Sequence, residues 1–459
     1  MILDYKEDVL NAVGETPLVR LNKVVDSKCA ALLVKCEHMS PTGSVKDRMA
    51  LHIVRAAEES GALKPGGTIV ENTSGNTGLG LAMIAAVRGY RCVLTMPDKM
   101  SLEKVNMLKA FGAEVVITPT DVPGDSPDHY VETAKRIARE TPNSFYVDQY
   151  HNPRNIEAHY LSTGPEIWRQ TEGKLDAFVA GVGTGGTTSG VGRFMKEQSR
   201  EVRIVGVDPI GSVHYDLFHH NKLVEPHVYK VEGMGEDIPC DAMDFAAVDD
   251  IRQVNDRQCF SMARRLVREE GLFCGGSSGG NVHIALEIAR ELGPDKVVVT
   301  ILPDSGTRYI TKHLSDAWMK DNGFLAPADL VGRVKDVLSH DAHEVSTVHG
   351  SDPISKAIDI MRAQSVSQIP VLDKDNRPHA VVHEVDVLKK ITFEGVAVDE
   401  PVIRIANPAR GFISPQDSLS ALYDILEEDH AAIVLDGDKL CGILTKIDLI
   451  NYLTRSVGV

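Results

Sequence analysis

Short apolar runs alternate with segments of helical periodicity over residues 1–320, and this alternation limits the possible folds more than any other feature. Residues 79–87 have helical spacing, as do Leu102, Val105 and Leu108. Apolar, β-branched runs that predict strands occupy residues 68–70, 91–96, 114–118, 177–180, 203–207 and 297–302. Strands and helices that alternate through glycine-rich turns are typical of an α/β fold with mostly parallel, helix-covered sheets. Ligands of such folds bind beyond the carboxyl ends of the strands.

The alternation ends near residue 320, and the rest of the chain repeats itself. Asn-Gly, Ala-Pro-Ala and acidic residues predict a linker over residues 321–331. After it, residues 332–395 and 396–459 both show the order helix, short apolar strand, turn, second strand and helix. We therefore predict one large domain over residues 1–320, followed by two small domains that form a pseudo-symmetric pair.

The composition restricts the partners of the chain. Its 459 residues carry a formal net charge of −16, which argues against nucleic acid because a phosphate backbone needs a basic surface. The N-terminus does not read as a secretory signal, and no apolar run approaches the ~20 residues that a membrane helix needs. The seven cysteines are scattered and form no Cys-x-x-Cys, so we expect reduced thiols, no metal site and a cytoplasmic protein.

A glycine-rich turn follows the expected strand at residues 177–180. Gly181, Gly183 and Gly186 fit the pattern G-x-G-x-x-G, and Asp208 ends the next strand, as in a nicotinamide dinucleotide site. However, glycines between a strand and a helix present backbone N–H groups to a phosphate of any kind. The turn therefore predicts a phosphate site without identifying the ligand.

Three other segments carry chemical information. Lys46 follows a turn at the opening of an expected helix over residues 49–57, where the helix dipole and Arg48 would lower the pKa of its amine. An amine of low pKa is suited to forming a Schiff base. Residues 72–78 read Asn-Thr-Ser-Gly-Asn-Thr-Gly between a strand and a helix, which predicts an anion site. Residues 274–280 form another turn of small residues before a helical run.

Together these segments resemble the β-family of pyridoxal-5′-phosphate (PLP) enzymes, which have the tryptophan synthase β-like fold (fold type II). The resemblance covers residues 13–316, and residues 11–19, 96–104, 148–150 and 302–305 look most like the cystathionine β-synthases. The duplicated tail resembles a tandem pair of CBS domains, or Bateman module, the regulatory module of those enzymes. We therefore expect a PLP-dependent catalytic domain and two CBS domains.

The resemblance implies a role for each motif residue. Lys46 would carry PLP and, once the substrate frees it, would act as general base at Cα. Asn76 would hydrogen-bond the ring oxygen of PLP, and Ser277 would face its pyridine nitrogen. The PLP phosphate would be held by Gly183, Thr184, Gly185, Gly186 and Thr187. The substrate carboxylate would be bound by Thr73, Ser74, Thr77 and Gln149.

The implied reaction condenses serine with homocysteine to cystathionine and water, and cysteine or sulfide could enter by the same route, with hydrogen sulfide as a side product. Three alternatives stay open: a cysteine synthase that uses O-acetylserine and sulfide, a dehydratase of serine or threonine, and an adenosyl-ligand sensor with a vestigial enzyme fold. The family also implies a homodimer or tetramer.

Some positions depart from the family pattern. The motif Gly-Glu-Thr-Pro-Leu begins at Gly14, so we expect no haem segment of the kind that animal enzymes have. Glu236 stands where a tyrosine is common, which leaves O-acetylserine or O-phosphoserine as competitors of serine. In the tail, Thr445 and Asp448 match the residues that contact a ribose in CBS domains, whereas His383 departs from the motif in the first repeat. S-adenosylmethionine or an adenine nucleotide would bind there, and a purely structural pair is the alternative.

Overall fold

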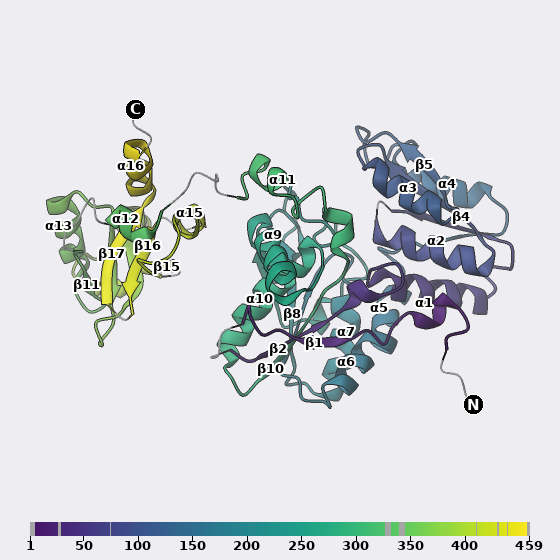
Figure 1. Cartoon of the computed structure of the whole chain (residues 1–459), viewed down its shortest axis with the longest axis horizontal. Coiled ribbons are helices and arrows are strands. Elements are labelled where there is room, and N and C mark those ends of the chain that lie inside the picture. The colour runs from purple at the N-terminus through teal and green to yellow at the C-terminus, as the bar shows by residue number, and fades with distance from the viewer. Residues whose placement is uncertain are drawn as a thin grey trace. The chain divides into compact units, whose positions relative to one another are not determined.

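The computed structural model describes residues 5–25, 29–73, 75–325, 332–338, 345–409, 411–428, 431–437 and 439–456 (Figure 1). The chain forms two compact units, residues 1–324 and 325–459. The predicted α/β class with two open, mostly parallel sheets in the first unit is confirmed. No helix within the described ranges is both long enough and apolar enough to cross a membrane.

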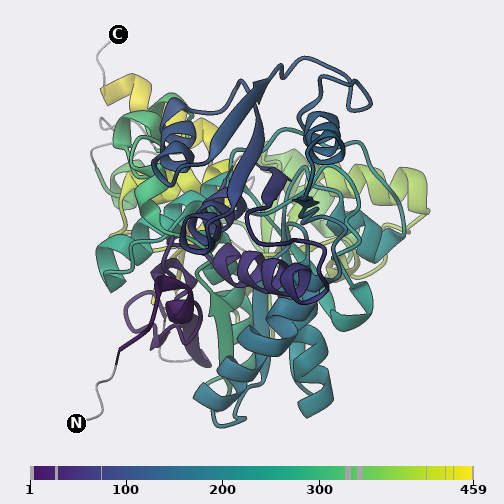
Figure 2. The ribbon, with the colours of Figure 1, turned by 90° about the vertical axis from the view of Figure 1, so that its right-hand side faces the viewer.

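The smaller sheet of the first unit has four parallel strands in the order β5–β4–β3–β6. These strands are β3 (Thr68–Asn72), β4 (Arg91–Pro97), β5 (Glu114–Thr118) and β6 (Ser144–Tyr146). Successive side chains point to opposite faces of the sheet. Ile69 and Leu94 share a core with three helices, α1 (Lys46–Glu59), α2 (Asn76–Arg88) and α3 (Leu102–Ala110). Val70 and Val93 pack instead against α4 (Tyr130–Glu140) on the other face. Figure 2 turns this half of the unit toward the viewer.

The larger sheet has six strands in the order β1–β2–β10–β7–β8–β9, of which β1 alone is antiparallel to its neighbour. These strands are β1 (Leu18–Arg20), β2 (Ala31–Lys35), β7 (Ala177–Gly181), β8 (Arg203–Pro209), β9 (Asp250–Val254) and β10 (Val297–Ile301). Helices α6 (Gly164–Gln170) and α7 (Gly186–Gln198) share one core with Phe178 and Ile204. Helices α9 (Asp256–Arg265) and α10 (Gly276–Leu292) cover the opposite face (Figure 1).

The second unit contains the two predicted repeats, each with the order helix, strand, strand, helix. The first repeat has α13 (Ile354–Gln364), β12 (Gln368–Leu372), β13 (Pro378–His383) and α14 (Glu384–Glu394). The second has α15 (Leu419–Glu428), β16 (Ala431–Asp436), β17 (Lys439–Thr445) and α16 (Lys446–Ser456). The edges of the two sheets are completed by three two-residue strands, β11 (Val348–His349), β14 (Asn407–Pro408) and β15 (Phe412–Ile413).

Each repeat has its own core, but the chain segments that fill the two cores are interleaved. Helix α12 (Val334–Leu338) lies within the predicted first domain, residues 332–395, yet its Val334 and Val337 are buried in the core of the second repeat. Conversely, Val402 and Ile405 follow the first repeat and are buried in its core. The boundary predicted between residues 395 and 396 separates the two sequence repeats. The side-chain packing crosses this boundary, because each core contains residues from both sides of it.

Candidate active site

A cavity of about 620 Å³ is lined by the segments that follow strands of both sheets in the first unit. Thr73 follows β3 and Gln149 follows β6 in the smaller sheet, while Gly183 follows β7 and Tyr309 follows β10 in the larger one. Because all four strands present their carboxyl ends to the cavity, it lies where ligands of such sheets bind.

The described residues that the sequence assigns to PLP and substrate lie around this cavity and a small adjoining one. The main cavity is lined by Lys46, Thr73, Asn76, Thr77, Gln149, Gly183 and Thr184. The small cavity is lined by Lys46, Gly183, Thr184, Gly185, Gly186, Thr187 and Ser277. Ser74, the remaining predicted substrate residue, lies outside the described residues. Lys46 is therefore accessible from both cavities, which suits a residue between a phosphate site and a substrate site.

Lys46 is the first residue of α1, and its environment differs from the one that the sequence suggests. Burial lowers the pKa of its amine, while the nearby carboxylates of Glu236 and Asp304 act to raise that pKa. The expected repulsion by Arg48 is not among the causes, and the Arg48 guanidinium is bound by two carboxylates of its own. Desolvation thus explains the lowered pKa of the lysine.

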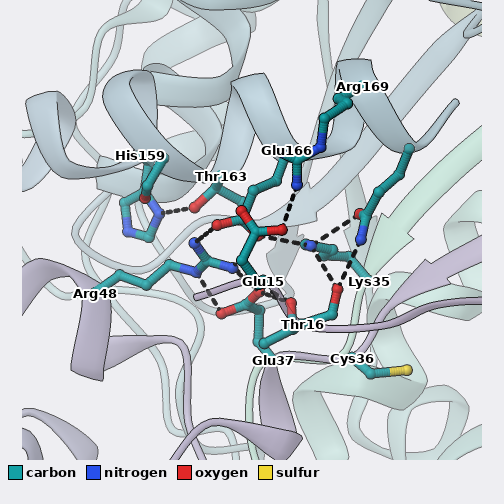
Figure 3. Close-up of polar contacts among 12 residues, drawn as sticks. Glu15, Thr16, Lys35, Cys36, Glu37, Arg48, His159, Thr163, Glu166 and Arg169 are labelled. Carbon is teal, nitrogen blue, oxygen red and sulfur yellow. Dashed lines mark hydrogen bonds and ion pairs between the residues drawn. The ribbon is translucent and has the colours of Figure 1, made fainter. Parts of the chain in front are cut away.

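A buried network of charges holds the first turn of α1 in place (Figure 3). Arg48 donates from Nε to Glu37 Oε2 at 2.7 Å and from Nη1 to Glu166 Oε1 at 2.7 Å. Lys35 Nζ at the end of β2 donates to Glu166 Oε2 at 2.8 Å and to the Thr16 carbonyl at 2.7 Å. The side chains of Lys35, Glu37 and Arg48 are at most 2% exposed, so the charges are paired away from water. The network joins α1, β2 and α6 two residues from Lys46.

Two glycines of the turn before α7, Gly185 and Gly186, leave no room for a side chain. Gly185 has φ +89°, and a Cβ on it would lie 2.5 Å from the Met243 Cα. A Cβ on Gly186 would lie 2.0 Å from Asn155 Oδ1. The turn therefore keeps its backbone N–H groups at the start of a 13-residue helix, an arrangement that suits a phosphate.

Two side chains from outside the motif support the threonines of this turn. Asn155 Nδ2 donates to Thr184 Oγ1 at 3.0 Å and to the Gln149 carbonyl at 2.8 Å. His159 Nε2 lies 3.2 Å from Thr187 Oγ1. Asn155 thus links the expected phosphate site to the expected substrate site.

Two buried polar atoms, one on a residue that lines the small cavity and one on a residue that lines the main cavity, support the fit of PLP. Ser277 stands in the first turn of α10 and is 1% exposed, and its Oγ has no hydrogen-bond partner among the described residues. Asn76 Nδ2 donates to Asp304 Oδ2 at 2.9 Å, whereas Asn76 Oδ1 is buried without a partner in the described part of the chain. Unpaired buried polar atoms are costly unless a ligand satisfies them. Together with the glycine turn, these residues fit a phosphorylated, nitrogen-containing ring.

The segments at the substrate side are joined by a short hydrogen bond. Thr77 Oγ1 donates to Gln149 Oε1 at 2.6 Å, and this contact does not use the Nε2 amide group of Gln149. The rest of the cavity wall is strongly basic, which favours amino-acid carboxylates despite the acidic chain as a whole. Its cations, besides Lys46, are Lys99, Lys104, Lys230, Arg308 and Lys312, and its acids are Glu232 and Glu236.

Sequence reasoning misses Asn155, His159 and Asp304, which contact motif residues from distant parts of the chain. Asp304 is the easiest of the three to find, because it lies in the segment at residues 302–305 that resembles the family. Asn155 and His159 lie in no motif from which their contacts with the site could be predicted.

The two residues predicted to contact a ribose lie in the second unit, where they contact each other. Thr445 donates from its backbone N and from Oγ1 to Asp448 Oδ2, at 2.7 and 2.6 Å. Thr445 immediately precedes α16 and Asp448 is the third residue of that helix, so the pair caps the helix N-terminus. In the first repeat, Asp386 accepts a hydrogen bond from Asn407 Nδ2.

Comparison with known proteins assigns the two units to families. The pyridoxal-phosphate dependent enzyme family matches residues 9–304, and the CBS domain family matches residues 334–392 and 399–455. The cystathionine beta-synthase of Oryctolagus cuniculus is 41% identical, with 97% of this chain and 84% of the relative aligned. The enzymes of the same name from Dictyostelium discoideum and Saccharomyces cerevisiae are 38% and 36% identical, with 98% of this chain and 93% and 98% of the relatives aligned. The chain, with its PLP-type catalytic unit and its CBS pair, therefore belongs to the cystathionine β-synthase family.

Proposed function

We propose that this protein condenses L-serine with L-homocysteine to L-cystathionine and water, with PLP held at Lys46. The observation that carries the proposal is the position of Lys46, whose amine is desolvated. Lys46 lines both the small cavity at the glycine turn and the main cavity, which is also lined by Thr73, Thr77 and Gln149. Family membership supports the same reaction, because the relatives bear the name of this activity.

Each residue has a defined task in this proposal. PLP, when bound, withdraws electrons from Cα of the attached amino acid. The N–H groups and hydroxyls of residues 183–187 hold its phosphate, and Ser277 and Asn76 face its ring. Thr73, Thr77 and Gln149 orient the carboxylate of serine. Lys46, whose pKa is lowered by burial, accepts the Cα proton with its amine and later returns it.

The test is to incubate the purified protein with serine and homocysteine and to measure cystathionine by mass spectrometry. Lys46→Ala should form none, while Lys64→Ala, which truncates an exposed lysine outside the cavity, should match the wild type. Product from both the wild type and Lys46→Ala would refute the role of Lys46. Cysteine from O-acetylserine and sulfide, without cystathionine, would replace the proposal with a cysteine synthase.

The proposal also covers the oligomeric state, the location, the absence of haem and a side reaction. We expect a homodimer or tetramer in the cytoplasm, with no haem, and hydrogen sulfide as a side product when cysteine is supplied. Sedimentation would give the oligomeric state, and a Soret band in the purified protein would contradict the absence of haem.

We also propose that the second CBS repeat binds S-adenosylmethionine or an adenine nucleotide through Thr445 and Asp448. These side chains now satisfy each other at the start of α16, and a ribose would add hydroxyl groups to the same pair. Isothermal calorimetry with S-adenosylmethionine, ATP and AMP on the full chain should show heat for at least one of them. No heat with any of the three would mean a purely structural pair.

A further inference from the structure

Glu236 places a carboxyl group inside the catalytic cavity, on the loop that passes over the glycine turn. The residue lines the same cavity as Lys46, Thr73 and Gln149. A Cβ on Gly183 would lie 3.7 Å from Glu236 Oε1, and a Cβ on Gly233 of the same loop would lie 3.7 Å from Ser277 Oγ. The loop therefore lies close both to the glycine turn, at Gly183, and to Ser277, the residue expected to face the pyridine nitrogen.

The backbone of Glu236 is fixed, while its carboxylate is left for a ligand. Glu236 N donates to Ser212 Oγ at 3.0 Å, and its carbonyl accepts from Val213 N at 3.2 Å. The neighbouring Gly235 N donates to the Val182 carbonyl at 2.7 Å. Within the described part of the chain, no hydrogen bond or ion pair uses the Glu236 carboxylate. A cavity-facing acid on an anchored backbone is arranged to act on the substrate.

The surroundings of this carboxyl favour exchange of a proton near neutral pH. Burial raises the pKa of Glu236 to about 7, Lys46 opposes that rise, and Asp237 and Asp208 add to it. The other titratable groups that interact with it are Tyr130, Tyr150, Tyr229 and Cys240. Burial and neighbouring acids raise the pKa of all four, so none of them competes as an acid near pH 7.

We infer that Glu236 is a further catalytic residue, which protonates the departing hydroxyl group of serine and then accepts the proton of the incoming thiol. This inference rests on the proposed function. Lys46 takes the Cα proton, the Cβ–O bond breaks with its electron pair on oxygen, and the Glu236 proton completes a water molecule. The thiol then gives its proton to the Glu236 carboxylate as sulfur bonds to Cβ. Cα recovers its proton from Lys46, so both residues return to their starting states.

The inference also assigns a substrate preference. Hydroxide is a poor leaving group that needs a proton, whereas the acetate of O-acetylserine leaves as a stable anion without one. The phosphate of O-phosphoserine would be repelled whenever Glu236 is ionised. An acid at this position thus favours serine over both competitors.

The test compares kcat/KM for serine and for O-acetylserine, with homocysteine as the common acceptor, in the wild type and in Glu236→Gln. In a ping-pong reaction, kcat/KM for the donor reports only the steps up to departure of the leaving group. Glu236→Gln should lower kcat/KM for serine by about 100-fold or more and that for O-acetylserine by less than about threefold. Glu225→Gln is the matched control: Glu225 is exposed, lies outside the cavity and is not among the groups that shift the pKa of Glu236, so both values should stay near the wild type.

The pH dependence provides a second readout. The ratio of kcat/KM for serine to that for O-acetylserine cancels the ionisation of the donor amine, which both substrates share. In the wild type this ratio should fall as pH rises through about 7, because Glu236 loses the proton that it must donate. In Glu236→Gln the ratio should not change with pH. The PLP absorbance of both proteins confirms equal cofactor loading.

The outcomes separate the inference from the proposed function. An equal loss with both donors, or no loss with serine, would overturn the role of Glu236 and would leave the Lys46 ammonium as the proton donor. A wild type that turns over O-acetylserine but not serine would overturn the proposed function and this inference together. Wild-type cystathionine formation with an unaffected Glu236→Gln would overturn the inference alone.

Discussion

Arg48 illustrates how a single buried side chain can position Lys46, the proposed catalytic lysine. Its guanidinium lies between Glu37 and Glu166, and Lys35 balances the second carboxylate (Figure 3). Such a network is not a reliable source of stability, since desolvation offsets much of the attraction. It does fix the direction in which α1 leaves its first turn, and hence the place of Lys46.

Removal of the Arg48 charge should therefore destabilise the catalytic unit. Arg48→Met leaves Glu37 and Glu166 buried without their main cation, which should lower the free energy of unfolding by about 3–5 kcal/mol. Both tryptophans of the chain, Trp168 and Trp318, lie in residues 1–324, so tryptophan fluorescence during urea unfolding reports on this unit alone. Arg91→Met is the control: it breaks the exposed pair with Glu114 and should cost less than about 1 kcal/mol.

Glu71 should make the stability of the same unit depend on pH. It is fully buried in β3, where its Oε2 accepts from Asp148 N at 2.8 Å, and burial raises its pKa from the ordinary value of 4.5 to about 8. Because the folded state holds this proton more tightly than the unfolded state, the stabilisation is complete below about pH 4.5. It is lost as pH rises through about 8.

The comparison of Glu71→Gln with the wild type isolates this effect. The amide cannot ionise, so the variant should gain stability relative to the wild type between pH 5 and pH 8.5. The gain should approach about 1.4 kcal/mol for each pH unit that separates the pKa of Glu71 in the folded chain from its value in the unfolded chain. Urea unfolding followed by tryptophan fluorescence at both pH values measures the difference. A difference between the two proteins that does not change with pH would contradict the raised pKa of Glu71.

At this scale, the sequence predicts those site residues that stand in continuous motifs. Lys46, Asn76 and the residues at 183–187 can be identified because each belongs to a short segment with a recognisable anion- or amine-binding pattern. The environment of Lys46 cannot be predicted from the sequence. Arg48 lies two residues from Lys46, but Glu166, which pairs with the Arg48 guanidinium, is 118 residues further along the chain.

At the scale of elements, the spacing of apolar residues and the positions of glycine-rich turns predict the strands that lead into the site. The strand predicted at residues 114–118 has the bounds of β5, and β10 ends one residue before the prediction. Helix α2 begins three residues earlier than its predicted span, because Asn76, Thr77 and Gly78 lack the apolar spacing that marks the rest of it. Two-residue strands such as β11 and β14 carry too few side chains for alternation to be visible.

The junction between the glycine turn and α7 should tolerate no added methyl group. Gly186→Ala would bring Cβ against Asn155 Oδ1, which lies 2.0 Å from the ideal position, so that Asn155 must move and release Thr184. Overpacking of this kind costs about 1–3 kcal/mol, and if that cost falls on the PLP-bound state the affinity for PLP should drop by about fivefold to 150-fold. Absorbance titration of the apoenzyme with PLP measures the dissociation constant.

Gly124→Ala provides the control for that substitution. A Cβ on Gly124 meets no atom within 4 Å, so the variant should bind PLP like the wild type. Wild-type affinity in Gly186→Ala would show that the turn does not hold the PLP phosphate.

At the scale of the whole molecule, the catalytic unit builds its cores and its cavity walls from its own residues. The cores around α1, α2 and the smaller sheet, and around α6, α7 and the larger one, contain no described residue beyond 324, and neither do the cavity walls. We therefore predict that a chain ending at residue 324 folds, takes up PLP and forms cystathionine. Its absorbance, unfolding midpoint by tryptophan fluorescence and product yield should be compared with those of the full chain. Loss of PLP binding in a folded fragment would contradict the prediction.

The interleaved cores of the C-terminal unit have a consequence for how such a tail can be inherited. A gene breakpoint between residues 395 and 396 would follow the sequence repeat, yet it would strip Val402 and Ile405 from one core and, with α12 upstream of the break, Val334 and Val337 from the other. Neither product would be a self-sufficient domain. Recombination that keeps both cores intact would therefore have to transfer the two copies together.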